Sequence, residues 1–248
     1  MPKQPKTPIS QISRLPDTEV CRLHDAPDNL LRKLLIPFCF PNRNRRTYKP
    51  VRLAQADIFQ SSTRMMAMPS STWGAVEAVI KKNCRGQDIE RMNLIAGKAL
   101  YEGLTQRGAS SQHEPQMKRK IVLSQDHNFG SWLPLVVDCS VSEELLIPLV
   151  DFRLGHGLDV SSRKFAFSMM HFAVRGASDE YDQAQFVIID MPATRTERRD
   201  KRTIVLERGA RFHLDQGQYY SLDELEEMVN RIYRLFAEVL HEEQRKAA

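Results

Sequence analysis

The sequence lacks the patterns that would assign a function at once. None of its apolar runs approaches the ~20 residues that a membrane-spanning helix requires. Its four cysteines include no pair at C-x2-C spacing, so a zinc site of that kind is not expected. Neither a Gly-x-Gly-x-x-Gly loop nor a Walker A loop is present, so nothing points to nucleotide-dependent chemistry. These absences exclude a transmembrane protein and a secreted disulfide-rich protein.

The remaining composition is that of an ordinary globular protein of 248 residues. The basic first residues are not followed by the apolar segment that a signal peptide contains, so a signal peptide is not expected. We therefore expect a cytoplasmic protein whose cysteines are free and reduced, and we expect no membrane partner.

Positive charge is concentrated in the first 100 residues, although the whole chain carries a net charge of only +5. One ten-residue stretch contains the basic residues Arg43, Arg45, Arg46, Lys49 and Arg52. Clustered cations attract phosphate backbones, so this stretch predicts a nucleic-acid-binding arm for DNA, and a solvated loop is the alternative. Tyr48 is the only aromatic residue inside the stretch, so a base-stacking platform is not indicated.

The chain is predicted to have three parts. Residues 1–18 contain four prolines and few large apolar residues, which is typical of a disordered tail. Residues 19–86 form a basic N-terminal segment with short helices. Residues 87–248 form an α/β core that ends in an amphipathic helix.

Helical periodicity is clearest at the C-terminus. Ser221-x-x-Glu224 is a capping box, and apolar residues then recur at helical spacing as far as Val239. This final helix either docks on its own sheet or binds a protein partner, and the sequence leaves both open. Further helices are predicted from caps and apolar spacing at 72–84, 88–104 and 161–175.

The β-branched and apolar runs predict strands at 48–53, 119–123, 132–139, 145–152, 185–191 and 203–207. The link 140–144 is short enough for a hairpin loop, so the strands beside it are expected to be antiparallel. The predicted fold class is α/β (α+β), with a mixed sheet whose hairpin strands are covered by helices on both faces. Its element order is α-β-β-β-α-β-β-α, after an N-terminal helical and basic segment.

The order of elements between residues 88 and 191 resembles the core of the restriction-endonuclease-like, or PD-(D/E)xK, superfamily. The resemblance rests on element order, and it implies metal-assisted cleavage of phosphodiesters. Carboxylates then hold Mg²⁺ or Mn²⁺, and a lysine orients or activates the attacking water. That family places an acidic residue on the first helix, an aspartate at the second strand and [DE]-x-K on the third.

Residues of this sequence fill that pattern in part. Glu102 falls on the first predicted helix, and Asp151-Phe152-Arg153 occupies the third-strand position, with Arg153 where lysine is expected. Arg153 keeps its proton near neutral pH, so it stabilises charge and does not act as a base. Asp138 ends the second strand, but Asp126, before that strand, is better placed to approach Asp151 across a hairpin. The resemblance thus implies a catalytic set of Glu102, Asp126, Asp151 and Arg153, with the metal on Asp126 and Asp151.

Three functional hypotheses remain. The first is a DNA-associated protein of a mobile-element or defence type, with a nuclease-like core that is either an active metal-dependent endonuclease or degenerate. The second is a non-enzymatic protein-interaction or regulatory protein with a basic phosphate-binding arm and no cofactor. The third is a small-molecule enzyme built around His156 and His171, close to Asp151. Metal dependence separates the first hypothesis from the second.

Overall fold

The structure is a computed structural model, and it describes thirteen parts of the chain. They are residues 8–12, 15–40, 48–59, 72–106, 109–111, 119–122, 128–131, 137–139, 144–152, 157–174, 185–191, 205–208 and 219–247. Of the predicted disordered tail, residues 1–7 and 13–14 lie outside the described residues.

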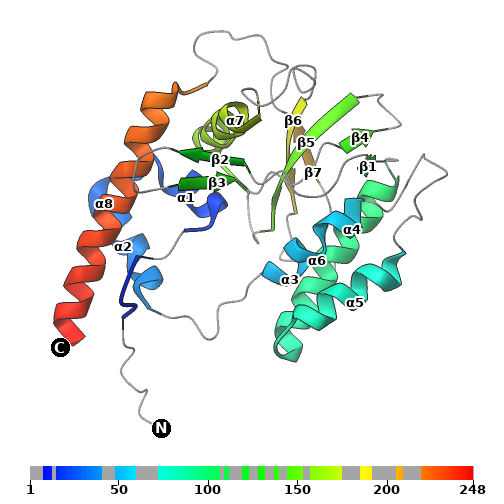
Figure 1. The fold of residues 1–248 in the computed structure, drawn as a ribbon, viewed down its shortest axis with the longest axis horizontal. Coiled ribbons are helices and arrows are strands. Elements are labelled where there is room, and N and C mark those ends of the chain that lie inside the picture. Colours follow the sequence, from blue (N-terminus) through cyan, green and yellow to red (C-terminus); the bar gives the residue numbers. More distant parts are fainter. Residues whose placement is uncertain are drawn as a thin grey trace.

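Helices dominate the described chain (Figure 1). Eight α-helices and one 3-10 helix are present in these parts: α1 (Asp17–Leu23), α2 (Asp28–Leu35), η1 (Ile36–Cys39), α3 (Lys49–Leu53), α4 (Gln55–Phe59), α5 (Trp73–Asn83), α6 (Gln87–Gln106), α7 (Val160–Val174) and α8 (Leu222–Ala247). The strands are β1 (Ala109–Ser111), β2 (Arg119–Val122), β3 (Asn128–Ser131), β4 (Val137–Cys139), β5 (Glu144–Asp151), β6 (Gln185–Asp190) and β7 (Val205–Arg208).

The strands form two sheets. One has the order β1-β4-β5-β6-β7, and the other pairs β2 with β3. Among the described strands only β5 and β6 are parallel, and α7 is the crossover between them. Their register pairs Leu146 with Gln185 at one end and Asp151 with Asp190 at the other. The carboxyl ends of these two strands therefore lie side by side.

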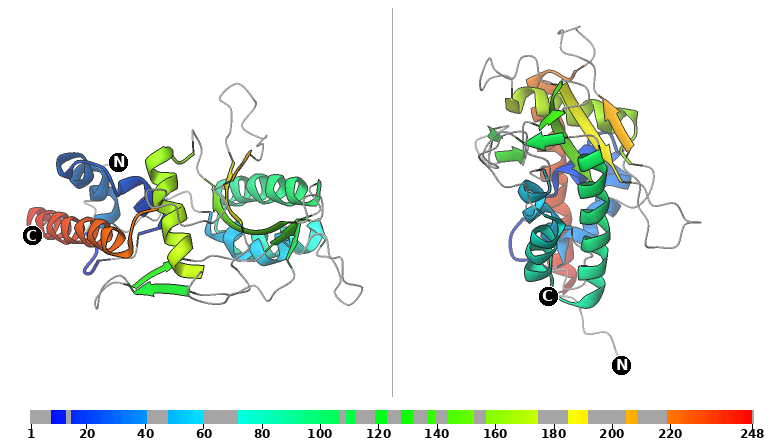
Figure 2. Two further views of the ribbon diagram at one scale, coloured as in Figure 1. Left: turned by 90° about the horizontal axis from the view of Figure 1, so that it is seen from above. Right: turned by 90° about the vertical axis from the view of Figure 1, so that its right-hand side faces the viewer.

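The buried side chains fall into two clusters, one on each face of the β5–β6 pair. Ile147, Phe186 and Ile188 belong to the first cluster, whereas Val150 and Val187 belong to the second. This alternation is what a strand buried on both faces produces. Figures 1 and 2 show α1, α2, α7 and α8 on one side of the strands and α3, α4, α5 and α6 on the other.

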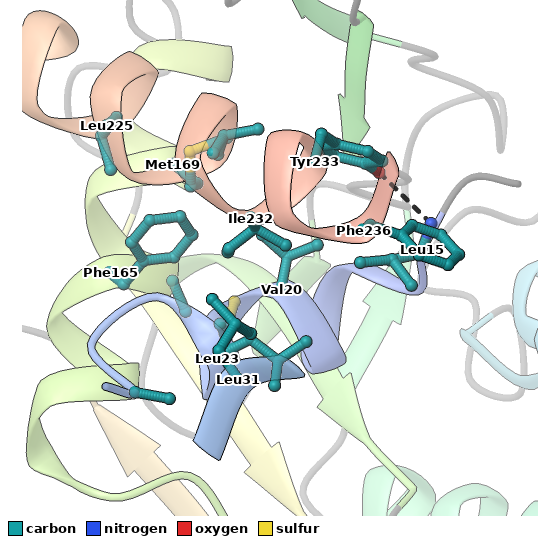
Figure 3. Close-up of a cluster of buried hydrophobic side chains, with 14 of the residues drawn as sticks. Leu15, Val20, Leu23, Leu31, Phe165, Met169, Leu225, Ile232, Tyr233 and Phe236 are labelled. Carbon is teal, nitrogen blue, oxygen red and sulfur yellow. Dashed lines mark hydrogen bonds between the residues drawn. The ribbon is translucent and has the colours of Figure 1, made fainter. Parts of the chain in front are cut away.

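The first cluster joins the two ends of the described chain. Helix α8 contributes Val229, Ile232 and Phe236, which pack against residues of α1, α2 and α7 (Figure 3). The backbone N–H of Leu15 donates to the Tyr233 hydroxyl at 3.2 Å, across 218 positions of sequence. The N-terminal helices are thus an integral part of the core that the C-terminal helix completes.

The second cluster is built from consecutive helices. Helices α5 and α6 are neighbours in sequence and in space, and α3 and α4 pack against both. A Cβ added at Gly97 on α6 would lie 2.6 Å from Cδ1 of Ile80 and 3.3 Å from Cγ2 of Val51. Glycine at this position therefore lets three helices approach closely.

The predicted fold class was wrong. The described chain is mostly helical, and its parallel pairing is confined to β5 and β6, with short antiparallel strands of three or four residues around them. Five strands, not three, stand between α6 and α7, and two of these form a separate sheet. The sequence Asn128–Ser131 contains Gly130 and no β-branched residue, so its strand gave no signal.

The strand predicted at 48–53 was also wrong, because this stretch forms helix α3. Pro50 lies in the first turn of that helix, where a missing backbone N–H costs nothing and the fixed φ favours the helix. Val51 faces the core and is fully buried. Tertiary packing of one side chain thus overrides the strand propensity of a short segment.

The final helix carries the predicted capping box. The Ser221 N–H donates to Glu224 Oε2 at 2.6 Å, and the Glu224 N–H donates to Ser221 Oγ at 3.2 Å. Its apolar stripe is covered by α1, α2, η1 and α7 of the same chain. The stripe is therefore not the partner surface that one reading of the sequence assigned to it.

Candidate interaction surface

The residues predicted to form a catalytic site occupy different environments. Glu102 lies on the surface of α6, with 56% of its side chain exposed, and pairs with Lys98 at 3.8 Å. Asp151 ends β5 and is 1% exposed. Asp126 and Arg153 lie outside the described residues, so their roles stay predictions. No group of three or more His, Cys, Asp or Glu in the described parts of the chain is arranged to hold a metal ion.

A second buried carboxylate lies beside Asp151. Asp190 ends β6 in register with Asp151, and its Oδ2 is 3.9 Å from a guanidinium nitrogen of Arg163 on α7. Gly157 has φ +72° and a Cβ there would lie 2.7–2.8 Å from the Asp190 carboxylate. The backbone at Gly157 therefore passes close to this carboxylate, and a side chain at position 157 would displace it.

His171, the described member of the proposed histidine pair, is buried near the end of α7. Its ring stacks on Tyr219 with the centroids 5.3 Å apart, and it meets the edge of Phe172 at 5.0 Å. These contacts are those of a packed core aromatic. His156 lies outside the described residues, so the small-molecule hypothesis stays a prediction.

The described cysteine side chains form no disulfide with one another. Cys21 and Cys39 are buried, and Cys84 is half-buried. Burial, with a contribution from Glu243, raises the pKa of the Cys39 thiol to about 11. Cys39 therefore stays protonated at neutral pH and behaves as a small apolar residue.

The basic stretch is described only at its C-terminal end. Lys49 and Arg52 lie on α3 and are exposed, whereas Arg43, Arg45 and Arg46 lie outside the described residues. The phosphate-binding role of the stretch stays a prediction.

Helices α3 and α4 form a two-sided segment, which we call the α3–α4 clip (residues 48–59). Each helix has only five residues, and so short a helix is not stable by itself. Its inner face is fully buried through Val51, Ala54, Ile58 and Phe59. In addition, the Val51 N–H donates to Oδ1 of the buried Asn93 on α6 at 3.1 Å. Packing and one buried amide therefore hold the clip on α5 and α6.

The outer face of the clip exposes Lys49, Arg52 and Leu53, beside the half-buried Tyr48. Arg52 places its guanidinium carbon 5.8 Å from the centroid of the Phe152 ring, and Tyr48 stacks on the same ring at 5.5 Å. Leu53 beside them is 52% exposed. Aromatic residues and arginine are enriched at protein interfaces and dominate their binding energy. Sequence reasoning treated Arg52 as a phosphate ligand and gave Leu53 no role. It placed Phe152 on a predicted strand about 100 positions later, and its contact with Arg52 is a tertiary one.

A second exposed apolar group lies on α2. Leu30 and Leu34 stand one helical turn apart on its outer face, and Ile36 of η1 follows. Lys33 and Arg32 lie between the two leucines in sequence, and Arg32 pairs with Glu238 and Glu242 of α8. This face therefore presents exposed leucines, whereas the clip combines its exposed leucine with an arginine over an aromatic ring.

Comparison with known proteins identifies the family of the chain. Residues 22–248 match the family described as the sliding clamp-binding bacterial toxin SocB. This chain belongs to the SocB family. The DNA replication inhibitor toxin SocB of Caulobacter vibrioides (strain NA1000 / CB15N) is 24% identical over 243 residues, which cover 94% of this chain and 93% of that relative. No solved structure matches the chain.

The SocB match overturns the resemblance to the restriction-endonuclease-like superfamily. Element order alone suggested that superfamily, and the description as a nuclease-like protein with a restriction-endonuclease-like fold was wrong. The second hypothesis, a protein-interaction function, agrees better with the SocB family. No helix in the described parts of the chain has the length and apolarity needed to cross a membrane.

Proposed function

We propose that this chain binds a bacterial sliding clamp and thereby inhibits DNA replication. The observation that carries the proposal is the family match, which extends from residue 22 to residue 248. The matching relative is aligned over nearly its whole length, so the likeness is not confined to one segment of the chain. We infer that the chain acts in the cytoplasm, where bacterial chromosomes are replicated.

The outer face of the α3–α4 clip is the surface that we assign to the clamp. It combines an exposed leucine, Leu53, with an arginine on an aromatic stack, and both lie on a segment fixed to a rigid helical pair. A rigid segment loses little conformational entropy on binding, so more of the contact energy appears as affinity. By covering part of the clamp, the chain excludes other proteins that use the same part.

The test measures binding of the purified chain to the sliding clamp of its own host in a biosensor. We expect Leu53→Glu to weaken binding at least about tenfold, because it buries a charge in the contact. The matched control is Leu34→Glu on α2, which changes an exposed leucine at a similar helical position. We expect this control to keep the affinity of the unchanged chain.

A primer-extension assay with a clamp-dependent polymerase links binding to inhibition. The chain should stop extension, extra clamp should restore it, and Leu53→Glu should not inhibit. Inhibition that extra clamp does not relieve, or an absence of binding at micromolar concentration, would contradict the proposal. Loss of binding in Leu34→Glu but not in Leu53→Glu would move the contact to α2 and overturn the assignment of the surface.

DNA binding by the basic stretch is a separate proposal that the same material tests. If Lys49, Arg52 and their neighbours hold phosphates, the chain binds duplex DNA without the clamp, and that binding weakens steeply between 50 and 200 mM salt. If the chain binds the clamp but does not bind DNA, the basic stretch does not act as a phosphate-binding arm.

A further inference from the structure

Helix α1 is followed by a buried histidine whose ring is held in one orientation. His24 is 2% exposed, and the centroid of its ring lies 4.7 Å from that of Phe165 on α7. Its Nδ1 lies 2.7 Å from the backbone carbonyl oxygen of Cys21. A carbonyl oxygen only accepts hydrogen bonds, so Nδ1 carries the hydrogen and donates it. In the neutral ring, Nε2 is therefore an acceptor.

That acceptor nitrogen meets a serine from a distant part of the chain. Ser161 Oγ lies 3.0 Å from His24 Nε2, across 137 positions of sequence, and the hydroxyl donates to this nitrogen. A serine becomes a nucleophile when an imidazole can take its proton and a third group holds the imidazole in the required tautomer. Here the Cys21 carbonyl is that third group, in the place that an aspartate holds in a Ser-His-Asp triad.

Ser161 lies at a place in the fold that a small molecule can reach. It is half-buried in the first turn of α7, and the preceding residue, Val160, is 80% exposed. Helix α7 follows the carboxyl end of β5 in the crossover to β6. Sites in open α/β sheets gather outside the carboxyl ends of parallel strands. The hydroxyl therefore lies at the end of the sheet where chemistry is usually found.

The first turn of α7 favours a negative charge beside the serine. The first N–H groups of a helix have no intrahelical acceptor, and the helix dipole makes this end positive. Asp159 already accepts from Ser162 N–H at 2.7 Å and from Arg163 N–H at 2.9 Å. The N–H groups of Val160 and Ser161 come one turn position earlier, so they are the donors that an oxyanion beside Ser161 would meet.

The neighbours of the serine favour a neutral substrate. The hydrogen bond from the Ser162 N–H lowers the pKa of the Asp159 carboxyl, so this residue is negative at neutral pH and repels anions. Val160 is apolar and exposed, and the ring of Tyr220 lies 5.9 Å from that of His24. These neighbours suit a small apolar acyl group.

We propose that Ser161 and His24 form a nucleophilic dyad that accepts the acyl group of small neutral esters. Ser161 Oγ attacks the carbonyl carbon, and its proton passes to His24 Nε2. The ester C–O bond breaks, the leaving alcohol takes that proton, and the acyl group stays on Ser161. Water, with His24 again as the base, hydrolyses the acyl-serine to a carboxylic acid and restores the hydroxyl.

The first experiment measures the release of p-nitrophenol from p-nitrophenyl acetate by the purified chain. We expect Ser161→Ala to lower the rate about a hundredfold, because the nucleophile and its general base act together. The matched control is Ser221→Ala, which removes an exposed hydroxyl that donates to Glu224 and not to a histidine. We expect this control to keep the rate of the unchanged chain.

The second experiment uses a fluorophosphonate probe, which labels a reactive serine irreversibly. Ser161 Oγ attacks the phosphorus atom, fluoride leaves, and the label is located by mass spectrometry of the peptides. We expect the label on Ser161 in the unchanged chain and no label in Ser161→Ala or His24→Gln. Should His24→Gln fail to fold, as circular dichroism would show, Ser161→Ala still decides the matter because it leaves the buried ring in place.

A purely structural contact between His24 and Ser161 gives different results. Ser161→Ala would then lower the melting temperature without changing the release of p-nitrophenol, and the probe would not label Ser161. Either result would overturn the proposal, and so would an acetyl group that is found on Lys164 and not on Ser161.

The dyad and the proposed clamp surface can be tested apart. Helices α1 and α7 border the first cluster, whereas the α3–α4 clip belongs to the second. We expect Leu53→Glu to weaken clamp binding and to keep the reactivity of Ser161. A chain that reacts with esters but does not bind the clamp would retain the dyad and lose the proposed function.

Discussion

The two cores on either side of β5 and β6 are assembled from different kinds of contact. The first joins residues more than 200 positions apart, and polar side chains bind its helices together at the surface. The second joins helices that follow one another in sequence, and a glycine and one buried amide set their spacing. The first core therefore depends on both ends of the chain, whereas the helices of the second core are neighbours in sequence that pack on β5 and β6. The candidate partner surface lies on the second.

The largest expected loss of unfolding free energy comes from removing one large buried side chain from either core. Phe236→Ala in the first cluster and Phe59→Ala in the second each remove a fully buried ring, which costs about 3–5 kcal/mol of unfolding free energy. Because both clusters share β5 and β6, we expect one cooperative denaturant transition in each variant.

The measurement compares circular dichroism with tryptophan fluorescence in a Trp132→Phe background, which leaves Trp73 beside the second cluster as the reporter. If Phe236→Ala shifted the circular dichroism transition and left the Trp73 fluorescence transition unchanged, the two cores would unfold independently, as separate domains.

The next largest effect is the loss of unfolding free energy when alanine replaces either of two glycines that have positive φ. Gly157 presses on Asp190, whereas a Cβ at Gly86, between α5 and α6, would meet nothing within 4 Å. Gly157→Ala is expected to cost about 2–4 kcal/mol, from the backbone and from the displaced carboxylate. Gly86→Ala should cost only the backbone part, about 1–2 kcal/mol. Thermal and denaturant unfolding measure the loss of unfolding free energy in each variant. If the two variants lose the same amount, the close approach of Gly157 to Asp190 contributes nothing to it.

The polar contacts of the first core provide a third comparison. Arg231 on α8 donates to the carbonyl oxygens of His24 and Ala26 and to Asp28, so it closes the link between α1 and α2. Arg32 on α2 pairs with Glu238 and Glu242 at a more exposed position. Arg231→Gln should cost about 1–3 kcal/mol, and Arg32→Gln less than about 1 kcal/mol.

Denaturant titration checks this ranking. If Arg32→Gln loses more unfolding free energy than Arg231→Gln, the ion pairs of Arg32 contribute more to holding α1 and α2 on α8 than the hydrogen bonds from Arg231 to the backbone carbonyls do.

The smallest expected effect concerns helix caps, one in each region. Ser221 caps α8 through its reciprocal bonds with Glu224, and Thr72 caps α5 with a longer 3.4 Å contact from Ala75. Ser221→Ala should cost about 1 kcal/mol and Thr72→Ala about half as much.

The Ser221 cap should also respond to pH. Hydrogen bonds from the Ser221 backbone N–H and, secondly, from its hydroxyl hold the pKa of Glu224 below its ordinary value. The hydroxyl part, which Ser221→Ala removes, is present above the unfolded pKa and is lost as pH falls through the folded pKa. The difference between the unchanged chain and Ser221→Ala should therefore shrink in acid. A difference that stays constant from neutral to acidic pH would contradict this assignment.

The sequence predicted the long elements well and the short ones poorly. The apolar helix α7, the buried strand β6 and the start of helix α8 were expected close to their observed bounds, because each carries a cap, a strong period or an unbroken apolar run. Helix α8 continues to Ala247, beyond the apolar stripe that ends at Val239. The helix at 49–53 and the strand at 128–131 were missed, because segments of four or five residues take their structure from their neighbours. Element order counted from such segments led to the wrong superfamily.

The candidate surface was still harder to predict. Lys49 and Arg52 were noticed as charges, but nothing in the sequence indicated that Phe152, about 100 positions later, lies beneath Arg52.

By itself the sequence determined which segments are amphipathic, where helix α8 is capped and that the cysteines carry no C-x2-C site, since these depend on neighbouring residues and on composition. Only the tertiary structure decided that α8 is covered by the first helices, that Asp151 lies beside Asp190 and that Leu53 is left at the surface. The reason is physical: burial depends on which faces of distant elements meet, and one chain's local periodicity does not specify that pairing.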